Sequence, residues 1–135
     1  MNHPITGYHF TDFTLDNKEY PITKGLILRR AKSGNEEIVE TNVLHLLVEH
    51  SPTGFEFGYG GSGPADLALN TVEIILHYIS HKGPRMACLS GNCFQKAYEL
   101  HQEFKWKFIA SAHRNTTNII PYEFMEKWVQ EKLEE

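Results

Sequence analysis

Cysteine, positive charge and long apolar runs are all scarce in this chain of 135 residues. Its two cysteines, Cys88 and Cys93, are too few for a disulfide framework. Lys and Arg number 13 against 17 Asp and Glu, a net charge of −4, which argues against duplex nucleic acid as a partner. No run approaches the roughly 18 apolar residues of a membrane span, and Met1–Pro4 lacks the apolar core of a signal peptide. These absences predict a cytoplasmic protein with reduced thiols and no membrane partner.

The residues that are present are those of a folded protein. Hydrophobic residues make up 41% of the chain and aromatic residues 12%, which is typical of a globular domain. The length fits one domain, and we find no internal repeat, low-complexity tract or linker. We therefore expect residues 1–135 to form a single domain.

Residues 1–60 have the pattern of short β-strands. A first pair is expected around Tyr8–Phe10 and Phe13–Leu15, and Asp16–Asn17 is typical of a hairpin turn. Residues 38–50 fit a buried strand or a short helix equally well. Further strands are expected over residues 20–23, 26–30 and 55–57.

From Pro64 onward the apolar spacing becomes that of helices. Pro64 suits a first helical turn, because its missing N–H needs no partner there. The spacing predicts helices over about residues 64–81, 93–112 and 121–134, with 82–92 as a connecting loop and Ile119–Ile120 as a brief strand. The predicted class is α+β, an N-terminal antiparallel β-sheet packed by about three helices.

The glycine-rich loop over residues 58–64 is the sharpest feature of the chain. Glycines would let a ligand approach the backbone, and the unpaired N–H groups of the following helix favour anions. Gly58, Gly60 and Gly63 have the G-x-G-x-x-G spacing, but no second strand with an acidic residue follows, as a dinucleotide fold requires. Pro64 stands where a P-loop has its Lys. The alternative is that the loop only makes a sharp turn, capped by Ser62 or Asp66.

We predict that a small phosphate-bearing ligand binds at this loop. The aromatic rings of the loop would supply stacking contacts. Arg29 and Arg30 lie on opposite faces of a strand, so one of them could complete the phosphate site with a bidentate contact. His50 could form an acid–base pair with Ser62 or Asp66. The predicted ligand-binding residues are Phe57, Tyr59, Gly60, Gly61, Ser62, Gly63, Asp66, Arg29 and His50.

A zinc site is an open alternative elsewhere in the chain. His77 and His81 have helical i, i+4 spacing, and Cys88 and Cys93 follow within 12 residues. The order and spacing differ from those of usual zinc knuckles, and two histidines near a helix end also complement its dipole. We therefore predict no metal and no cofactor. The sequence shows no convergent set of catalytic groups, so we predict no catalytic residue either.

Lys105, Trp106 and Lys107 place an aromatic ring between two cations on the second predicted helix. This pattern suits stacking of a base or an anchor for a partner protein. Trp128 on the last helix is a second candidate anchor.

The run from His50 to Leu69 resembles the signature of a small prokaryotic and phage family, catalogued as a domain of unknown function, with the pattern SPTGFEWGYGGSGPAxLAL. Gln102–Trp106 resembles a second part of the family pattern. Phe57 stands where the family has Trp, and residues 82–93 lengthen a connection that is short in the family. The resemblance covers about residue 45 to the C-terminus. It implies an intracellular protein carried by a phage or mobile element, and it implies no activity.

The predicted function is non-enzymatic binding of a small, nucleotide-like ligand at the glycine-rich loop. In a phage such a protein would sequester a nucleotide signal of host defence. The alternative is a protein-interaction module that inhibits a host protein, with the glycine-rich motif purely structural. A homodimer is the default expectation for a soluble assembly.

Overall fold

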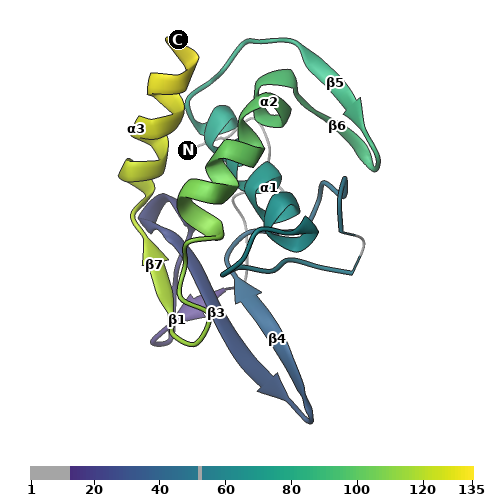
Figure 1. Ribbon diagram of the computed structural model, residues 1–135. Coiled ribbons are helices and arrows are strands. Elements are labelled where there is room, and N and C mark those ends of the chain that lie inside the picture. Colours follow the sequence, from purple (N-terminus) through teal and green to yellow (C-terminus); the bar gives the residue numbers. More distant parts are fainter. Residues whose placement is uncertain (1–12, 52) are drawn as a thin grey trace.

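The computed structural model describes residues 13–51 and 53–135, so the expected strand at Tyr8–Phe10 lies outside the described residues. The architecture is α+β, as the sequence predicts. Figure 1 shows the helices gathered at one end of a small antiparallel sheet, with a separate hairpin beside them.

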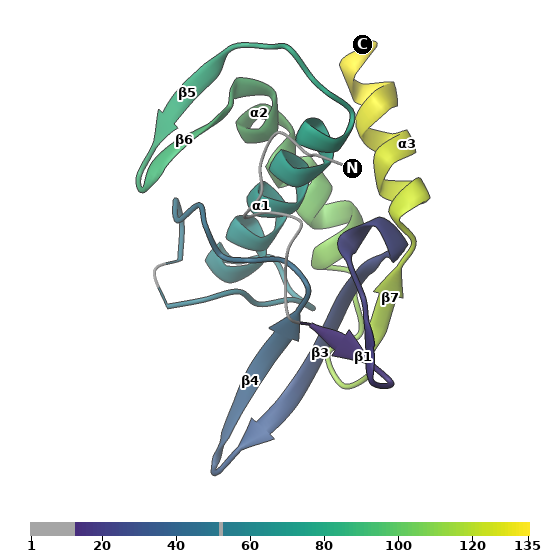
Figure 2. The ribbon, with the colours of Figure 1, turned by 180° about the vertical axis from the view of Figure 1, so that it is seen from behind.

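Strand β3 (Leu26–Ser33) is the centre of the main sheet. It pairs antiparallel with β4 (Glu36–Thr41) on one side and with β7 (Asn118–Ile120) on the other. Leu26, Ile27 and Leu28 are all fully buried, so both faces of β3 are covered where the strand begins. Further along, β3 and β4 leave the helices as a two-stranded arm (Figures 1 and 2).

The first described hairpin confirms the predicted turn. Strands β1 (Thr14–Leu15) and β2 (Lys18–Glu19) are joined by Asp16 and Asn17, whose φ angles are 54° and 65°. Two left-handed residues in a row are the conformation of a type I′ turn. The strand expected over residues 20–23 is wrong, because a 3₁₀ helix, η1 (Ile22–Lys24), forms there.

Helix α1 (Ser62–Tyr78) is the centre of the core. Every residue from Gly63 to Leu76 is buried, because α2 (Gln95–Phe104), the π-helix η2 (Lys105–Ile109) and α3 (Tyr122–Leu133) pack around it. The predicted apolar face of α1 is buried, but so are polar side chains on its other faces. These are Asp66, Asn70, Thr71 and Glu73.

Helix α3 completes the core with Trp128, the second tryptophan of the chain. Trp128 is buried, and its ring lies 5.6 Å from that of Phe104 and 6.1 Å from that of Phe108, centroid to centroid. Both contacts have the edge-to-face geometry that aromatic pairs prefer. The expectation that Trp128 anchors a partner protein is therefore wrong in this structure.

The segment expected to be a loop forms a hairpin. Strands β5 (Arg85–Cys88) and β6 (Gly91–Phe94) pair antiparallel across Leu89 and Ser90, so the second predicted helix begins at Gln95 rather than at residue 93. Arg85 holds this hairpin to the core, since it bonds to Glu73 and lies over the ring of Phe94. The local sequence contains Gly and Pro and no clear alternation, so its pattern resembled that of a loop.

Two other expectations for the first half differ from the structure. Residues 55–57 form no strand, and the described residues between β4 and α1 are irregular. Buried Asn42 ends β4: its side chain accepts a hydrogen bond from the N–H of Ile27 at 2.9 Å and donates to the carbonyls of Tyr20 and Gly25. A side chain thus supplies hydrogen bonds that a continuing strand would have made.

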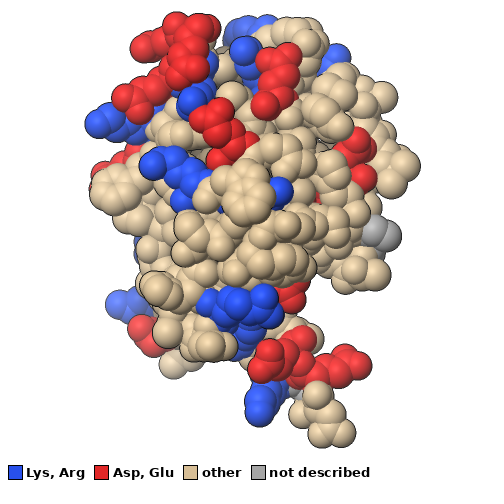
Figure 3. Space-filling view, in the orientation of Figure 1, with Lys and Arg blue, Asp and Glu red and all other residues tan. Residues whose placement is uncertain are grey.

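The surface carries charge of both signs. Figure 3 shows acidic groups over the C-terminal end of α3, and groups of both signs over the β3–β4 arm. Among the described residues, no helix combines the length and hydrophobicity needed to cross a bilayer.

Candidate functional site

The glycine-rich segment lies directly against two aromatic rings. A Cβ atom at Gly60 would overlap the indole of Trp106, and one at Gly61 would come within 2.5 Å of the Tyr59 ring. Only glycine lets both rings contact the backbone this closely. The Gly60–Gly61 step therefore positions Tyr59 and Trp106.

A third glycine of the segment makes room for a cation. Gly58 has a φ of 87°, which disfavours other residues, and a Cβ there would also overlap the side chain of Arg114. The Arg114 guanidinium lies 5.5 Å from the centroid of the Tyr59 ring, within cation–π distance. The segment thus joins a cation to the two rings.

Exposure separates the aromatic residues of this region into two classes. Trp106 is 60% exposed and Tyr59 is 43% exposed, whereas Phe57 is fully buried. The Phe57 ring lies in the core beneath the guanidinium of Arg30, at 4.6 Å. The ligand contact predicted for Phe57 is therefore excluded in this structure, and Tyr59 and Trp106 are the rings that a ligand can reach.

The arginine that faces the loop is Arg30 and not Arg29. Arg29 points away, where it donates to Glu40 at 2.8 Å. Arg30 makes the predicted bidentate contact, but with the chain's own Glu56, at 2.6 and 3.0 Å, and it also donates to the carbonyl of Phe57. Arg30 therefore supports the site, and its charge is already paired.

The Arg30–Glu56 pair is stable in its ionised form. The hydrogen bond from Arg30 to Glu56 raises the pKa of the guanidinium. Partial burial acts to raise the pKa of Glu56, but hydrogen bonds from Arg30 and from the Phe57 N–H outweigh it and hold that pKa below its usual range. Both effects keep the two charges in place near neutral pH.

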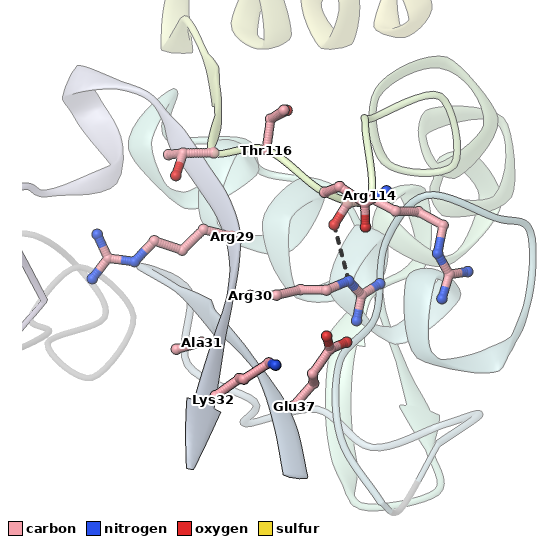
Figure 4. Close-up of a pocket in the computed structure, with 9 residues that line it drawn as sticks. Arg29, Arg30, Ala31, Lys32, Glu37, Arg114 and Thr116 are labelled. Carbon is pink, nitrogen blue, oxygen red and sulfur yellow. Dashed lines mark hydrogen bonds between the residues drawn. The ribbon is translucent and has the colours of Figure 1, made fainter. Parts of the chain in front are cut away.

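A basic hollow lies between the β3–β4 arm and the loop after η2. Figure 4 shows Arg30, Lys32 and Glu37 on one side of it and Arg114 on the other, while Arg29 points in the opposite direction. Arg30 donates to the Arg114 carbonyl at 3.1 Å, which ties the two sides together. Uncharged polar side chains complete the lining, namely Asn115, Thr116 and Thr117. Two cations here, Lys32 and Arg114, have no carboxylate partner among the ion pairs of the described residues.

The N-terminus of α1 does not offer the anion site that the sequence predicts. The hollow beside Ser62 and Gly63 is lined by three carboxylates, those of Glu36, Glu37 and Glu56. A phosphate there would meet negative charge, and Pro64 removes one of the N–H donors. The expected cap is also wrong, because Gly61 is the N-cap residue and no side chain caps the helix.

Asp66 anchors the chain before the loop instead of contacting a ligand. It is fully buried, and its carboxylate accepts hydrogen bonds from the N–H groups of Glu49, His50 and Ser51 at 2.9 to 3.1 Å. The ring of His45 is a fourth partner at 3.1 Å. These bonds occupy both oxygens, so a ligand would have to displace the protein's own backbone to reach Asp66.

Comparison with known proteins matches part of the chain to a family whose function is unknown. Residues 27–82 match DUF6166, a family of unknown function. The matched segment spans β3, β4, the glycine-rich loop and α1, so it begins earlier and ends earlier than the expected resemblance from about residue 45 to the C-terminus. No curated protein and no solved structure matches the chain.

Two histidines connect the DUF6166 segment to α2. His50 meets Asp66 only through its backbone N–H, and its ring nitrogen Nε2 lies 2.9 Å from Nε2 of buried His101. His101 donates from Nδ1 to the carbonyl of Tyr98, so its Nε2 accepts from His50 when both rings are neutral. Burial lowers the pKa of His101, and the neighbouring His50 and Lys105 lower it further. The hydrogen bond to the Tyr98 carbonyl and the charge of Asp66 raise it, but the net pKa is lowered.

Acidification is therefore expected to destabilise the fold. The unfolded chain protonates His101 near its usual pKa of 6.5, whereas the folded chain takes up that proton only at lower pH. Below pH 6.5 the unfolded state thus holds more protons, so the free energy of unfolding decreases as the pH decreases. The decrease is at most about 1.4 kcal/mol per pH unit for one proton. Urea unfolding at several pH values between about pH 7 and pH 5 measures this free energy. It should depend less steeply on pH in His101→Gln than in the wild type. The exposed-residue control His113→Gln should match the wild type, and a slope unchanged in His101→Gln would contradict the prediction.

The residues of the alternative zinc site are not arranged as metal ligands in the described part of the chain. His77 bonds to Glu73 at 3.0 Å, and His81 packs edge-on against the ring of Phe94. Burial, with a smaller effect of Cys88, raises the pKa of the Cys93 thiol to about 12, which opposes the thiolate that zinc requires. In the part of the chain that the structure describes, no three His, Cys, Asp or Glu side chains are grouped to hold a metal.

Sequence reasoning pointed to Arg29 and Arg30 but missed the other residues that line the basic hollow. Strand alternation does put Arg30 and Lys32 on one face of β3, which was the available signal. Arg114 and Thr116 lie outside the DUF6166 segment, more than 80 residues along the chain from that strand. No local pattern could have joined them to it.

Proposed function

We propose that this protein binds a small phosphate-bearing, nucleotide-like ligand without acting on it, in the Lys32–Arg114 hollow beside the glycine-rich loop. The observation that carries the proposal is the contact of the loop glycines with the side chains of Tyr59 and Arg114. The same few glycines seat Arg114 and the exposed ring of Tyr59 next to each other. A cation and a flat ring side by side match the phosphate and the base of a nucleotide.

The charges of the hollow favour a nucleotide over a bare anion. Lys32 and Arg114 would bind the phosphate, and the hydroxyls of Thr116 and Thr117 can donate to it. Glu37 would repel a second anion, but its carboxylate can accept hydrogen bonds from ribose hydroxyls, as acidic residues do in dinucleotide sites. The ligand thus needs both an anion and hydroxyl donors.

Removing the Arg114 charge should weaken binding strongly. We expect Arg114→Gln to reduce the affinity for AMP by about tenfold to a hundredfold, since hydrogen bonds to a charged group are worth about 1.5–3 kcal/mol. Isothermal titration calorimetry measures this. Lys127→Gln on α3 is the matched control, because it removes one exposed charge away from the hollow. Equal AMP affinities in wild type and Arg114→Gln, or binding of no nucleotide at all to the wild type, would refute the proposal.

The biological setting depends on that binding. A phage-borne, cytoplasmic homodimer that sequesters a nucleotide signal of host defence is the setting we propose for it. The cheapest test is native mass spectrometry of protein purified from bacterial cells. A co-purified mass of a few hundred daltons that is lost on denaturation would support a sequestered nucleotide, and the intact mass gives the oligomeric state.

An interaction module is the second candidate function. It is favoured by Trp106, whose ring is 60% exposed on the surface of the protein, since tryptophan is prominent among the anchors of protein interfaces. In that case the glycine-rich loop would only support the ring. Capture of a host protein that is lost in Trp106→Ala, with no nucleotide binding, would favour this function.

A further inference from the structure

Trp106 is in contact with the glycine-rich loop although its ring is exposed. It lies on η2, where the N–H of Ala110 donates to the carbonyl of Lys105 at 2.8 Å, the five-residue spacing of a π-helix. Such widened turns recur at functional sites. The tip of the indole touches the backbone at Gly60, so the ring is supported on one edge while 60% of the residue faces solvent.

The surroundings of Trp106 are cationic. The Lys105 ammonium lies 4.5 Å from the centroid of the indole, and the exposed Lys107 follows on the same turn. A protein-binding tryptophan is usually surrounded by contacts that exclude water. An exposed ring next to one ammonium group, that of Lys105, instead suits a partner that is both aromatic and anionic. The Lys107 ammonium lies over the Phe108 ring.

The two exposed rings share one support. Trp106 lies against Gly60 and Tyr59 lies against Gly61, and consecutive Cα atoms are only about 3.8 Å apart. One backbone step therefore supports two exposed rings. The Arg114 guanidinium lies over the Tyr59 ring and the Lys105 ammonium lies over the Trp106 ring.

From this arrangement we infer that the ligand is a dinucleotide, with one base on Tyr59 and the second base on Trp106. The inference rests on the proposed function and deepens it. A mononucleotide with its phosphate in the basic hollow would reach the Tyr59 ring only along the Arg114 side chain, which links the two. It would leave Trp106 and Lys105 unused. A second, phosphate-linked nucleotide supplies the aromatic and anionic group that this part of the surface suits.

The test compares AMP with the linear dinucleotide pApA by titration calorimetry. The wild type should bind pApA at least about tenfold more tightly than AMP, because stacking one base on an aromatic side chain is worth about 1–3 kcal/mol. Trp106→Ala should lose the preference and bind pApA and AMP with about equal affinity. Phe124→Ala is the matched control: Phe124 is equally exposed, at 60%, on α3, and its loss should change neither affinity.

A second measurement needs no variant. Of the two tryptophans, only Trp106 is exposed, so pApA should quench the tryptophan emission of the wild type and AMP should not.

The outcomes separate this inference from the proposed function. Equal affinities of the wild type for AMP and pApA would overturn the inference while the proposed function stands, and so would a Trp106→Ala variant that keeps its preference for pApA. Binding of neither compound would overturn both.

Discussion

Asp66→Ala is expected to lower the free energy of unfolding by about 4 kcal/mol or more. The substitution would leave the N–H groups of Glu49, His50 and Ser51 without their acceptor. A buried donor left unpaired costs about 1–3 kcal/mol, and three consecutive donors would be affected. Urea denaturation followed by circular dichroism measures the change.

Asp66→Asn is the control for this prediction. Asparagine keeps the shape and one acceptor oxygen, so its loss of stability should be clearly smaller than that of Asp66→Ala. Glu123→Ala, an exposed carboxylate at the start of α3, should change stability by less than about 0.5 kcal/mol. A loss below about 1 kcal/mol in Asp66→Ala would show that residues 49–51 are held by something other than this carboxylate.

Glu73→Ala is expected to cost about 3 kcal/mol and to release the β5–β6 hairpin. The buried carboxylate accepts the N–H of Phe94 at 2.7 Å and bonds to Arg85 at 3.2 Å and to His77 at 3.0 Å. Without it, the Phe94 N–H loses its acceptor and Arg85 loses its buried partner, a combination among the more destabilising changes.

Hydrogen exchange localises the effect of Glu73→Ala. The amide of Phe94 should lose protection far more than amides of β3, because Phe94 donates to Glu73 and no described residue of β3 bonds to it. Glu73→Gln keeps an acceptor for Phe94 and should retain much of that protection. Unchanged protection at Phe94 in Glu73→Ala would mean that hairpin pairing alone holds the segment.

Asp66 and Glu73 also show where the sequence misled. Both lie on α1, for which apolar spacing predicted one buried face. The helix is buried on all sides over Gly63–Leu76, so its polar residues became attachment points for irregular chain. Asp66 holds residues 49–51, Asn70 holds Leu46 and Leu47, and Glu73 holds the β5–β6 hairpin. A charged residue opposite an apolar face is normally solvated, and nothing local indicates that other segments will cover it.

Local sequence patterns did predict the turns and helices that depend mainly on residues close together in the chain. Asp16–Asn17 is a hairpin turn because these residue types tolerate positive φ. The spacing of apolar residues and the prolines 64 and 121 identified α1 and α3 to within a few residues. The β5–β6 strands are only four residues each, too short for alternation to stand out.

The sequence by itself determined the α+β class, the helical half of the chain and the presence of a glycine-rich loop before α1. Those features follow from the periodicity of apolar residues and from the φ angles that glycine and proline allow. Both depend only on residues that are close together in the sequence. Only the tertiary structure decided that Arg30 and not Arg29 faces the loop, that Phe57 is core, and that Trp106, Tyr59 and Arg114 meet on its glycines. The reason is distance along the chain, since Arg30 and Arg114 are 84 residues apart. The pairing of β7 with β3 brings the segment that contains Arg114 next to Arg30.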